Sequence, residues 1–119
     1  MAATPRTITF DCADPQAQAR FWSAVTGRPV DEQGNAYAAA IGMWPRTGSL
    51  ALLFLAVPEP KTAKNRVHLD LECDDRRAEV ARLVDLGATH VADHDEWGIS
   101  WSVLLDPEGN EFCLAATHD

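Results

Sequence analysis

The sequence predicts an α+β protein made of two βαβββ modules in one chain, and two observations predict this fold class. A strand, an Asp-capped helix and three further strands occur twice in the same order, and a shift of 61 residues superposes the two copies. A polar segment with two prolines, 58–65, lies between them. Because neither copy can cover its own sheet, we expect the copies to pair, with a small molecule in the cavity between them.

Module one begins with a half-buried strand and a capped helix. Residues alternate in polarity over Thr7–Ala13, which is typical of such a strand. A helix is expected near Asp14–Thr26, because Asp14 is a good N-cap, Pro15 suits the first turn and Gly27 suits the C-terminus. Trp22 falls on this helix and is expected in the core.

The rest of module one is predicted as three strands. They are a short one around Val30, a second over Ala36–Met43 and a continuously apolar third over Leu50–Val57. The chain of 119 residues fits one domain. We expect module one at about 5–57, the linker at 58–65 and module two at about 66–117.

Module two repeats the pattern. The predicted elements are a strand at His68–Asp74, a helix at Asp75–Leu86, strands at His90–His94, Ser100–Leu105 and Glu111–Ala115, and a turn at Asp106–Asn110. In the superposition Thr7 falls on His68, Cys12 on Cys73 and Asp14 on Asp75. Few residues are identical, so the repeat is one of pattern.

Composition limits the partners and the location. The net charge of −8 and the pI of about 4.8 argue against nucleic acid and against an anionic membrane surface, and favour a neutral or cationic small ligand. No apolar run approaches the ~18 residues of a membrane span, and the first residues lack the pattern of a signal peptide. We therefore expect a cytoplasmic protein. Cys12, Cys73 and Cys113 are odd in number and widely spaced, which predicts reduced thiols rather than a disulfide framework.

Four segments resemble the glyoxalase-like domain of the vicinal oxygen chelate superfamily, which includes glyoxalases, bleomycin-resistance proteins and extradiol dioxygenases. They are D-P-Q-A-Q-A-R-F-W at 14–22, V-P-E-P-K at 57–61, N-R-V-H-L-D-L at 65–71 and D-P-E-G-N-E-F at 106–112. The resemblance covers nearly the whole chain. It implies paired βαβββ modules whose mixed sheets curl into a cleft with the helices outside, often in a dimer.

The resemblance also implies four metal-ligand positions, one on the first and one on the last strand of each module. Here they carry Thr7, Leu55, His68 and Cys113. Thr7 is a poor ligand and Leu55 cannot ligate, so His68 and Cys113 alone are too few for a catalytic zinc unless Asp70, Glu72 or Glu111 turns in. We therefore expect no catalytic metal and no cofactor.

Two other catalytic arrangements are disfavoured. A nucleophilic pair of Cys113 and His68 would need a lowered thiol pKa, which nearby acidic residues oppose. His90 and His94 would lie about 13 Å apart along a strand, too far for one ion, and a solvated turn is the better interpretation of this segment. No nucleophile elbow, phosphate loop or dinucleotide motif is present.

The sequence thus predicts a protein that binds an organic small molecule in the cleft between its modules, without a catalytic metal, and that forms a homodimer. Trp44, Trp97 and Trp101 are expected near the cleft mouth, where aromatic walls suit an organic ligand. The predicted ligand-binding residues are Thr7, Thr9, Asp11, Trp44, Leu55, His68, Asp70, Trp101 and Cys113. The alternatives are a metal-dependent lyase, isomerase or dioxygenase of the glyoxalase type, and a dimerising module without a ligand.

Overall fold

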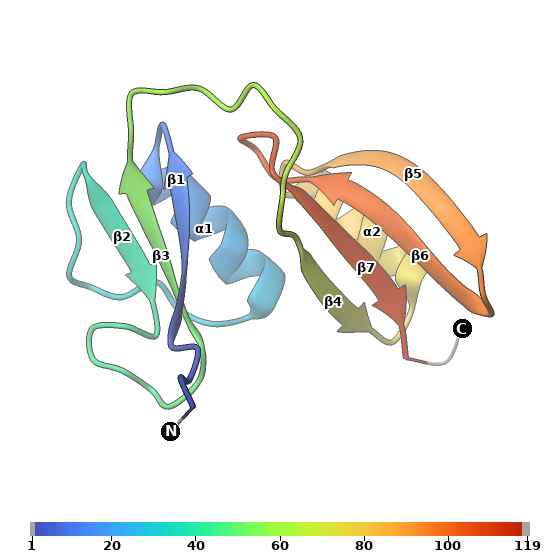
Figure 1. The fold of residues 1–119 in the computed structure, drawn as a ribbon, viewed down its shortest axis with the longest axis horizontal. Coiled ribbons are helices and arrows are strands. Elements are labelled where there is room, and N and C mark those ends of the chain that lie inside the picture. The colour runs from blue at the N-terminus through green and yellow to red at the C-terminus, as the bar shows by residue number, and fades with distance from the viewer. Residues whose placement is uncertain (1, 118–119) are drawn as a thin grey trace. The chain divides into compact units, whose positions relative to one another are not determined.

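The structure, a computed structural model, describes residues 2–117 and consists of two compact units. Unit one ends at Pro60 and unit two begins at Lys61. The elements in chain order are β1 (Thr7–Cys12), α1 (Pro15–Thr26), β2 (Ala38–Ile41), β3 (Ala51–Ala56), β4 (Leu69–Cys73), α2 (Arg76–Asp85), β5 (Thr89–Glu96), β6 (Ile99–Leu105) and β7 (Glu111–Ala116). Each unit has its own sheet and helix (Figure 1), so the predicted α+β class with two modules is confirmed.

Unit one contains a three-stranded sheet in the order β1-β3-β2, with α1 packed against one face. β1 is parallel to β3, and β2 is antiparallel to it. The Phe10 ring lies between two others, with centroids 5.3 Å from Trp22 on α1 and 5.2 Å from Phe54 on β3. Trp22 is only 1% exposed, which confirms its predicted place in the core.

The α1 helix begins and ends where the sequence predicts. The Asp14 side chain accepts a hydrogen bond of 3.1 Å from the Ala17 N–H, and Pro15 occupies the first turn. Gly27 ends the helix with a φ of 71°, in the left-handed region that glycine adopts at little cost.

The strand predicted around Val30 is wrong, because residues 28–37 form no strand in the structure. Pro29 has no N–H to give to a ladder. The Asp31 N–H bonds to the Ala40 carbonyl at 2.8 Å, while the Asp31 carboxylate accepts the backbone N–H groups of residues 42–44. This carboxylate joins two loops where a fourth strand would lie, so the order of elements in unit one is βαββ.

Unit two contains a four-stranded sheet in the order β4-β7-β6-β5, with α2 covering one face (Figure 1). β4 is parallel to β7, while β6 is antiparallel to both β7 and β5. The core between helix and sheet is almost fully buried and comprises Leu83, Leu104, Phe112 and Leu114. The Asp75 side chain caps α2 by accepting the Ala78 N–H at 3.1 Å, as predicted.

The solvated turn expected near His94 is wrong, because β5 continues to Glu96 and pairs with β6 along its length. A two-residue turn, Trp97–Gly98, joins the strands, with φ of 56° and 75°. Positive φ at both central residues matches the right-handed twist of a hairpin. The predicted Asp106–Asn110 turn is confirmed, since Asp106 accepts the N–H groups of Glu108 and Asn110, both at 2.9 Å.

Strand register shows how closely the two units repeat each other. Thr9 on β1 pairs with Leu53 on β3, and Asp70 on β4 pairs with Cys113 on β7. The thiols follow the same rule, because Cys12 donates to the Leu55 carbonyl and Cys73 to the Ala115 carbonyl. The last strands therefore superpose with a shift of 60 residues, which makes Leu53 the counterpart of Cys113.

Candidate functional site

The predicted ligand-binding residues fall into two groups, one in each unit. Thr7, Thr9, Asp11, Trp44 and Leu55 lie in unit one, and His68, Asp70, Trp101 and Cys113 lie in unit two. The cleft expected between the modules stays a prediction.

In unit one the structure brings few polar groups together. Thr7, Thr9 and Asp11 follow one another along one face of β1, and Asp11 pairs with Leu55. Trp44 lies outside these strands, in the loop after β2, where its backbone N–H donates to the Asp31 carboxylate at 2.8 Å. Leu53, rather than Leu55, occupies the position equivalent to Cys113, and neither leucine can bind a metal.

In unit two the predicted site residues lie on the face of the sheet that is turned away from α2. Asp70, Cys113, Val103 and Ala92 form one row across the four strands. Trp101 lies two residues from Val103 and therefore shares this face. We call it the α2-distal face.

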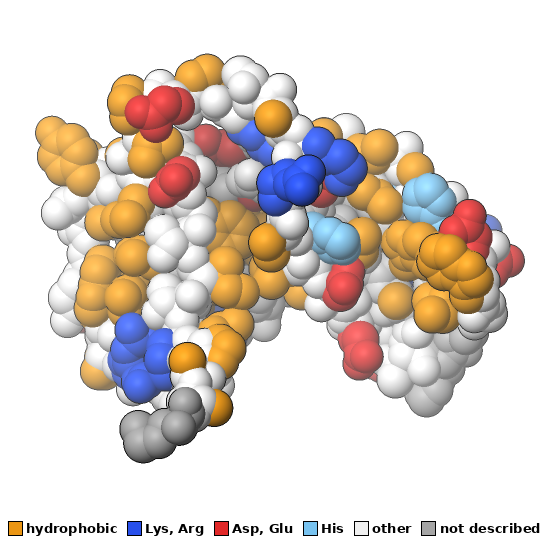
Figure 2. All heavy atoms as spheres, in the orientation of Figure 1, with side chains coloured by type: hydrophobic (Ala, Val, Ile, Leu, Met, Phe, Trp, Pro, Cys, Tyr) orange, Lys and Arg blue, Asp and Glu red, His pale blue; other side chains and the backbone are white. Residues whose placement is uncertain are grey.

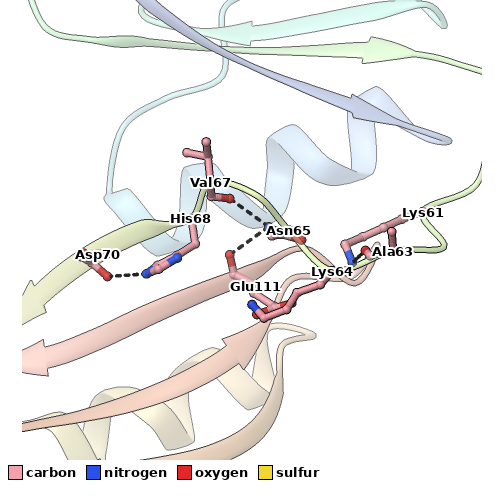
Figure 3. A network of polar contacts seen from close by, with 8 residues as sticks. All are labelled: Lys61, Ala63, Lys64, Asn65, Val67, His68, Asp70 and Glu111. Atoms are coloured by element: carbon pink, nitrogen blue, oxygen red, sulfur yellow. Dashed lines mark hydrogen bonds and ion pairs between the residues drawn. The ribbon is translucent and has the colours of Figure 1, made fainter.

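Three metal-binding side chains meet at one edge of the α2-distal face. The His68 Nε2 atom lies 3.2 Å from the Asp70 Oδ1 atom (Figure 3). One ligand atom from each of His68, Asp70 and Cys113 lies within 4.8 Å of the other two. The parallel pairing of β4 with β7 brings Asp70 beside Cys113, which makes Asp70 the third group that the sequence left open.

The charge around Cys113 favours the protonated thiol. Burial raises the pKa of the Cys113 thiol, and the nearby Asp70 and Glu111 carboxylates raise it further. A thiolate is the form that attacks an electrophile. The arrangement therefore opposes a nucleophilic Cys113, as the sequence suggested.

The same three residues fit one class of metal ion. Imidazole, thiol and carboxylate are all zinc donors, and three protein ligands are the usual number in a catalytic zinc site. A tetrahedral zinc holds its ligand atoms about 3.3–3.8 Å apart, so separations of up to 4.8 Å would need to shorten by about 1 Å before the three residues could bind one ion. Ions that prefer oxygen, such as Mg²⁺, find one carboxylate here and fit poorly.

A polar network joins the chain just before His68 and β4 to the start of β7 (Figure 3). Lys64 Nζ lies 2.8 Å from Glu111 Oε2, and Asn65 Nδ2 donates to the Glu111 carbonyl at 3.4 Å. The hydrogen bond from Lys64 lowers the pKa of the Glu111 carboxyl, which favours the charged carboxylate. Figure 2 shows basic, histidine and acidic side chains gathered over this segment.

An aromatic stack occupies the β5–β6 end of the α2-distal face. The His94 and Trp101 rings have centroids 5.0 Å apart and planes inclined by 25°. Trp101 stacks in turn on Trp97, at 6.1 Å and 12°. Trp101 was a predicted site residue, but the stacking of His94 on Trp101 was not predicted. The signal that could have found it is Gly98, which suits the second position of a hairpin turn, because a two-residue turn at 97–98 places His94 opposite Trp101.

His90 points the other way and belongs to a different cluster. Its Nε2 atom donates to Asp93 Oδ1 at 2.8 Å, and the Ser102 hydroxyl donates to the same oxygen at 2.7 Å. Arg76 donates to Ser102 at 2.9 Å, beside a surface pocket of about 720 Å³. The hydrogen bonds from Ser102 and His90 hold the pKa of Asp93 below its usual range.

A register shift between His90 and Ala92 turns His90 to the α2 side while His94 stays on the opposite face. The two histidines therefore lie on opposite faces of the sheet, which separates them further than the distance along the strand alone. Among residues 2–117, neither helix is long and apolar enough to cross a membrane.

Comparisons with known proteins agree with this architecture. The sequence model of a family described as "Glyoxalase-like domain" matches residues 7–115. No curated protein matches the chain.

Similar solved structures cover nearly the whole chain. One is a glyoxalase/bleomycin resistance protein/dioxygenase family enzyme from Burkholderia phytofirmans, at 22% identity and a TM-score of 0.76, covering 96% of this chain and 98% of that one. Another is the bleomycin-binding protein of Streptomyces verticillus complexed with copper(II)-bleomycin, at 16% identity and 0.63, covering 98% of both chains. A third is a mutant fosfomycin resistance protein, FosX, from Listeria monocytogenes, complexed with Mn(II) and 1S,2S-dihydroxypropylphosphonic acid, at 9% identity and 0.75, covering 97% and 90%. At these identities the likeness shows the fold alone.

Proposed function

Since this chain belongs to the glyoxalase-like domain family, we propose that it binds a small organic molecule, neutral or cationic, without a resident catalytic metal. One observation carries the proposal. A single face of the four-stranded sheet combines three polar groups with an aromatic stack, from Asp70 and Cys113 to Trp101. In ligand pockets apolar area supplies affinity and a few polar groups supply orientation, and this face offers both kinds of group.

Charge supports the neutral or cationic class. Unit two carries thirteen acidic and six basic side chains. A field of this sign raises the local concentration of cations and disfavours anions. The S. verticillus relative binds copper(II)-bleomycin, which makes that complex a natural first probe.

Isothermal titration with copper(II)-bleomycin and a panel of neutral and cationic aromatic compounds tests the proposal. We expect at least one compound to bind, with Asp70→Asn weakening it about tenfold through loss of a charge-assisted hydrogen bond. Asp74→Asn removes a charge near the other side of the same sheet and serves as the matched control. A panel without binders, or equal losses in both variants, would contradict the proposal.

A metal-dependent lyase, isomerase or dioxygenase is the second candidate, and the 4.8 Å cluster of His68, Asp70 and Cys113 favours it. When bound, a zinc ion would supply Lewis acidity at these three residues. We place it second because unit one has Thr9 and Leu53 where unit two has Asp70 and Cys113.

Elemental analysis of protein purified without chelator separates the two candidates. We expect well below one equivalent of zinc, manganese or iron per chain. About one equivalent that is lost in His68→Ala, in protein that remains folded, would restore the metalloenzyme.

We also propose that the protein is a cytoplasmic homodimer, as small proteins of this family commonly are. Light scattering at micromolar concentration tests the assembly. A mass near 13.0 kDa throughout would contradict it.

A further inference from the structure

The β5–β6 turn places a tryptophan where neither backbone preference nor burial accounts for it. Trp97 has a φ of 56°, a region that bulky residues avoid. It is also 84% exposed, so the strain is not offset by removal of the ring from water. Asparagine followed by glycine is the pair that such a turn favours.

The Trp97 ring instead extends an aromatic ladder, defined as His94, Trp101 and Trp97. The inclinations of 25° and 12° make the three planes nearly parallel. Trp97 stands at the outer end of the ladder, because Trp101 contacts both of the others. A planar ring can therefore continue the stack on the exposed face of Trp97.

The surroundings of the aromatic ladder are acidic. Glu96 precedes Trp97 and, by strand alternation, lies on the same face as His94. Figure 2 shows hydrophobic side chains next to acidic ones at this end of the hairpin. Tryptophan is also the best cation–π acceptor among the side chains.

We propose that the aromatic ladder binds the planar, cationic ring of a small organic ligand by stacking on Trp97. This inference rests on the proposed function, whose ligand it narrows from neutral or cationic to planar and cationic. It also gives the ladder end of the face a role separate from that of His68, Asp70 and Cys113.

The probe for the test is 1-methylquinolinium, a planar cation, followed by the indole N–H signals in ¹⁵N-correlated NMR spectra. We expect the signals of Trp97 and Trp101 to move while that of the buried Trp22 stays in place. Quinoline at pH 8 is the neutral counterpart and should bind about 2–5-fold more weakly, the value of an exposed cation–π contact. Naphthalene-1-sulfonate, an anion, should not bind.

Trp97→Asn is the decisive variant, because it removes the ring while giving the turn its preferred residue. We expect it to fold and to weaken 1-methylquinolinium binding at least tenfold. Tyr37→Ala is the matched control, since it removes another strongly exposed aromatic ring, 76% exposed, from unit one. It should leave binding unchanged.

The inference is overturned if wild-type protein does not bind 1-methylquinolinium, if Trp97→Asn binds it as well as wild type, or if quinoline binds equally tightly. It is also overturned if the Trp97 signal moves only with protein concentration, which would identify a contact between copies. The proposed function fails separately, when no panel compound binds in a way that Asp70→Asn weakens.

Discussion

The two units share one backbone plan but differ in what they place on it. Both have a strand, an Asp-capped helix and a parallel pairing of the first and last strands. At the same register position, unit one pairs Thr9 with Leu53, whereas unit two pairs Asp70 with Cys113. The shared features are those that fold the chain, and the differing ones are those that can bind or react.

Charge separates the units as well. Unit one has four basic and five acidic side chains, while unit two has six and thirteen. Nearly all of the net charge of −8 therefore belongs to unit two. Unit two therefore holds most of the charge and, at the matched register position, the side chains that can bind a metal or donate a proton.

The largest expected effects test whether the two cores are equivalent. Phe54 and Leu114 lie at matching positions of β3 and β7, and are 0% and 2% exposed. Phe54→Ala should cost about 3–5 kcal/mol and Leu114→Ala about 2–5 kcal/mol, because each leaves a cavity. Urea denaturation measures both, and a loss below 1 kcal/mol in either would mean that its core is not packed as described.

Stability at acidic pH should differ between the two units. The pKa of Asp93 is lowered in the folded protein, so its contribution to stability is present above the unfolded pKa of about 4 and is lost as pH falls through the lower folded value. We expect unit two to lose stability as the pH drops below 4 and Asp93→Asn to flatten that dependence. Glu79 and Glu111, whose pKa values are also lowered, should add to the dependence in the same direction.

Ser102→Ala addresses the same cluster at neutral pH. The residue is 1% exposed and joins Arg76 to Asp93, so its loss should cost about 1–2 kcal/mol. Thermal unfolding followed by circular dichroism measures the change. A neutral effect would show that the hydrogen bonds merely replace equivalent ones to water.

Local chemistry made most of the fold predictable from the sequence. Both Asp caps, the Gly27 terminus and the Asp106 turn depend on interactions within a few residues, and each was found correctly. The errors came from strand pairing. The chain near Val30 makes one backbone hydrogen bond to β2, from the Asp31 N–H to Ala40, but forms no strand, and the Asp31 carboxylate binds the loop after β2.

The candidate site, like the fold, was predictable from local motifs but not where it depends on strand pairing. The family resemblance pointed to both His68 and Cys113, and the structure places their side chains close together. Two further contacts depend on strand register, because Asp70 lies beside Cys113 and His94 lies beside Trp101 only when the strands pair as observed. Alternation gives the face of a residue, but its cross-strand partner requires the register, which a bulge such as that between His90 and Ala92 changes.

The smallest expected effects come from one glycine in each unit. Gly27 and Gly98 have φ of 71° and 75°, and an added Cβ would meet nothing within 4 Å at either position. Alanine at each site therefore changes only the backbone preference, at a cost of about 1 kcal/mol. Equal losses in urea denaturation would mean that the units respond alike wherever the change is purely local. A much larger loss for Gly98→Ala would show that the hairpin beneath the aromatic ladder has a conformational constraint that the end of α1 lacks.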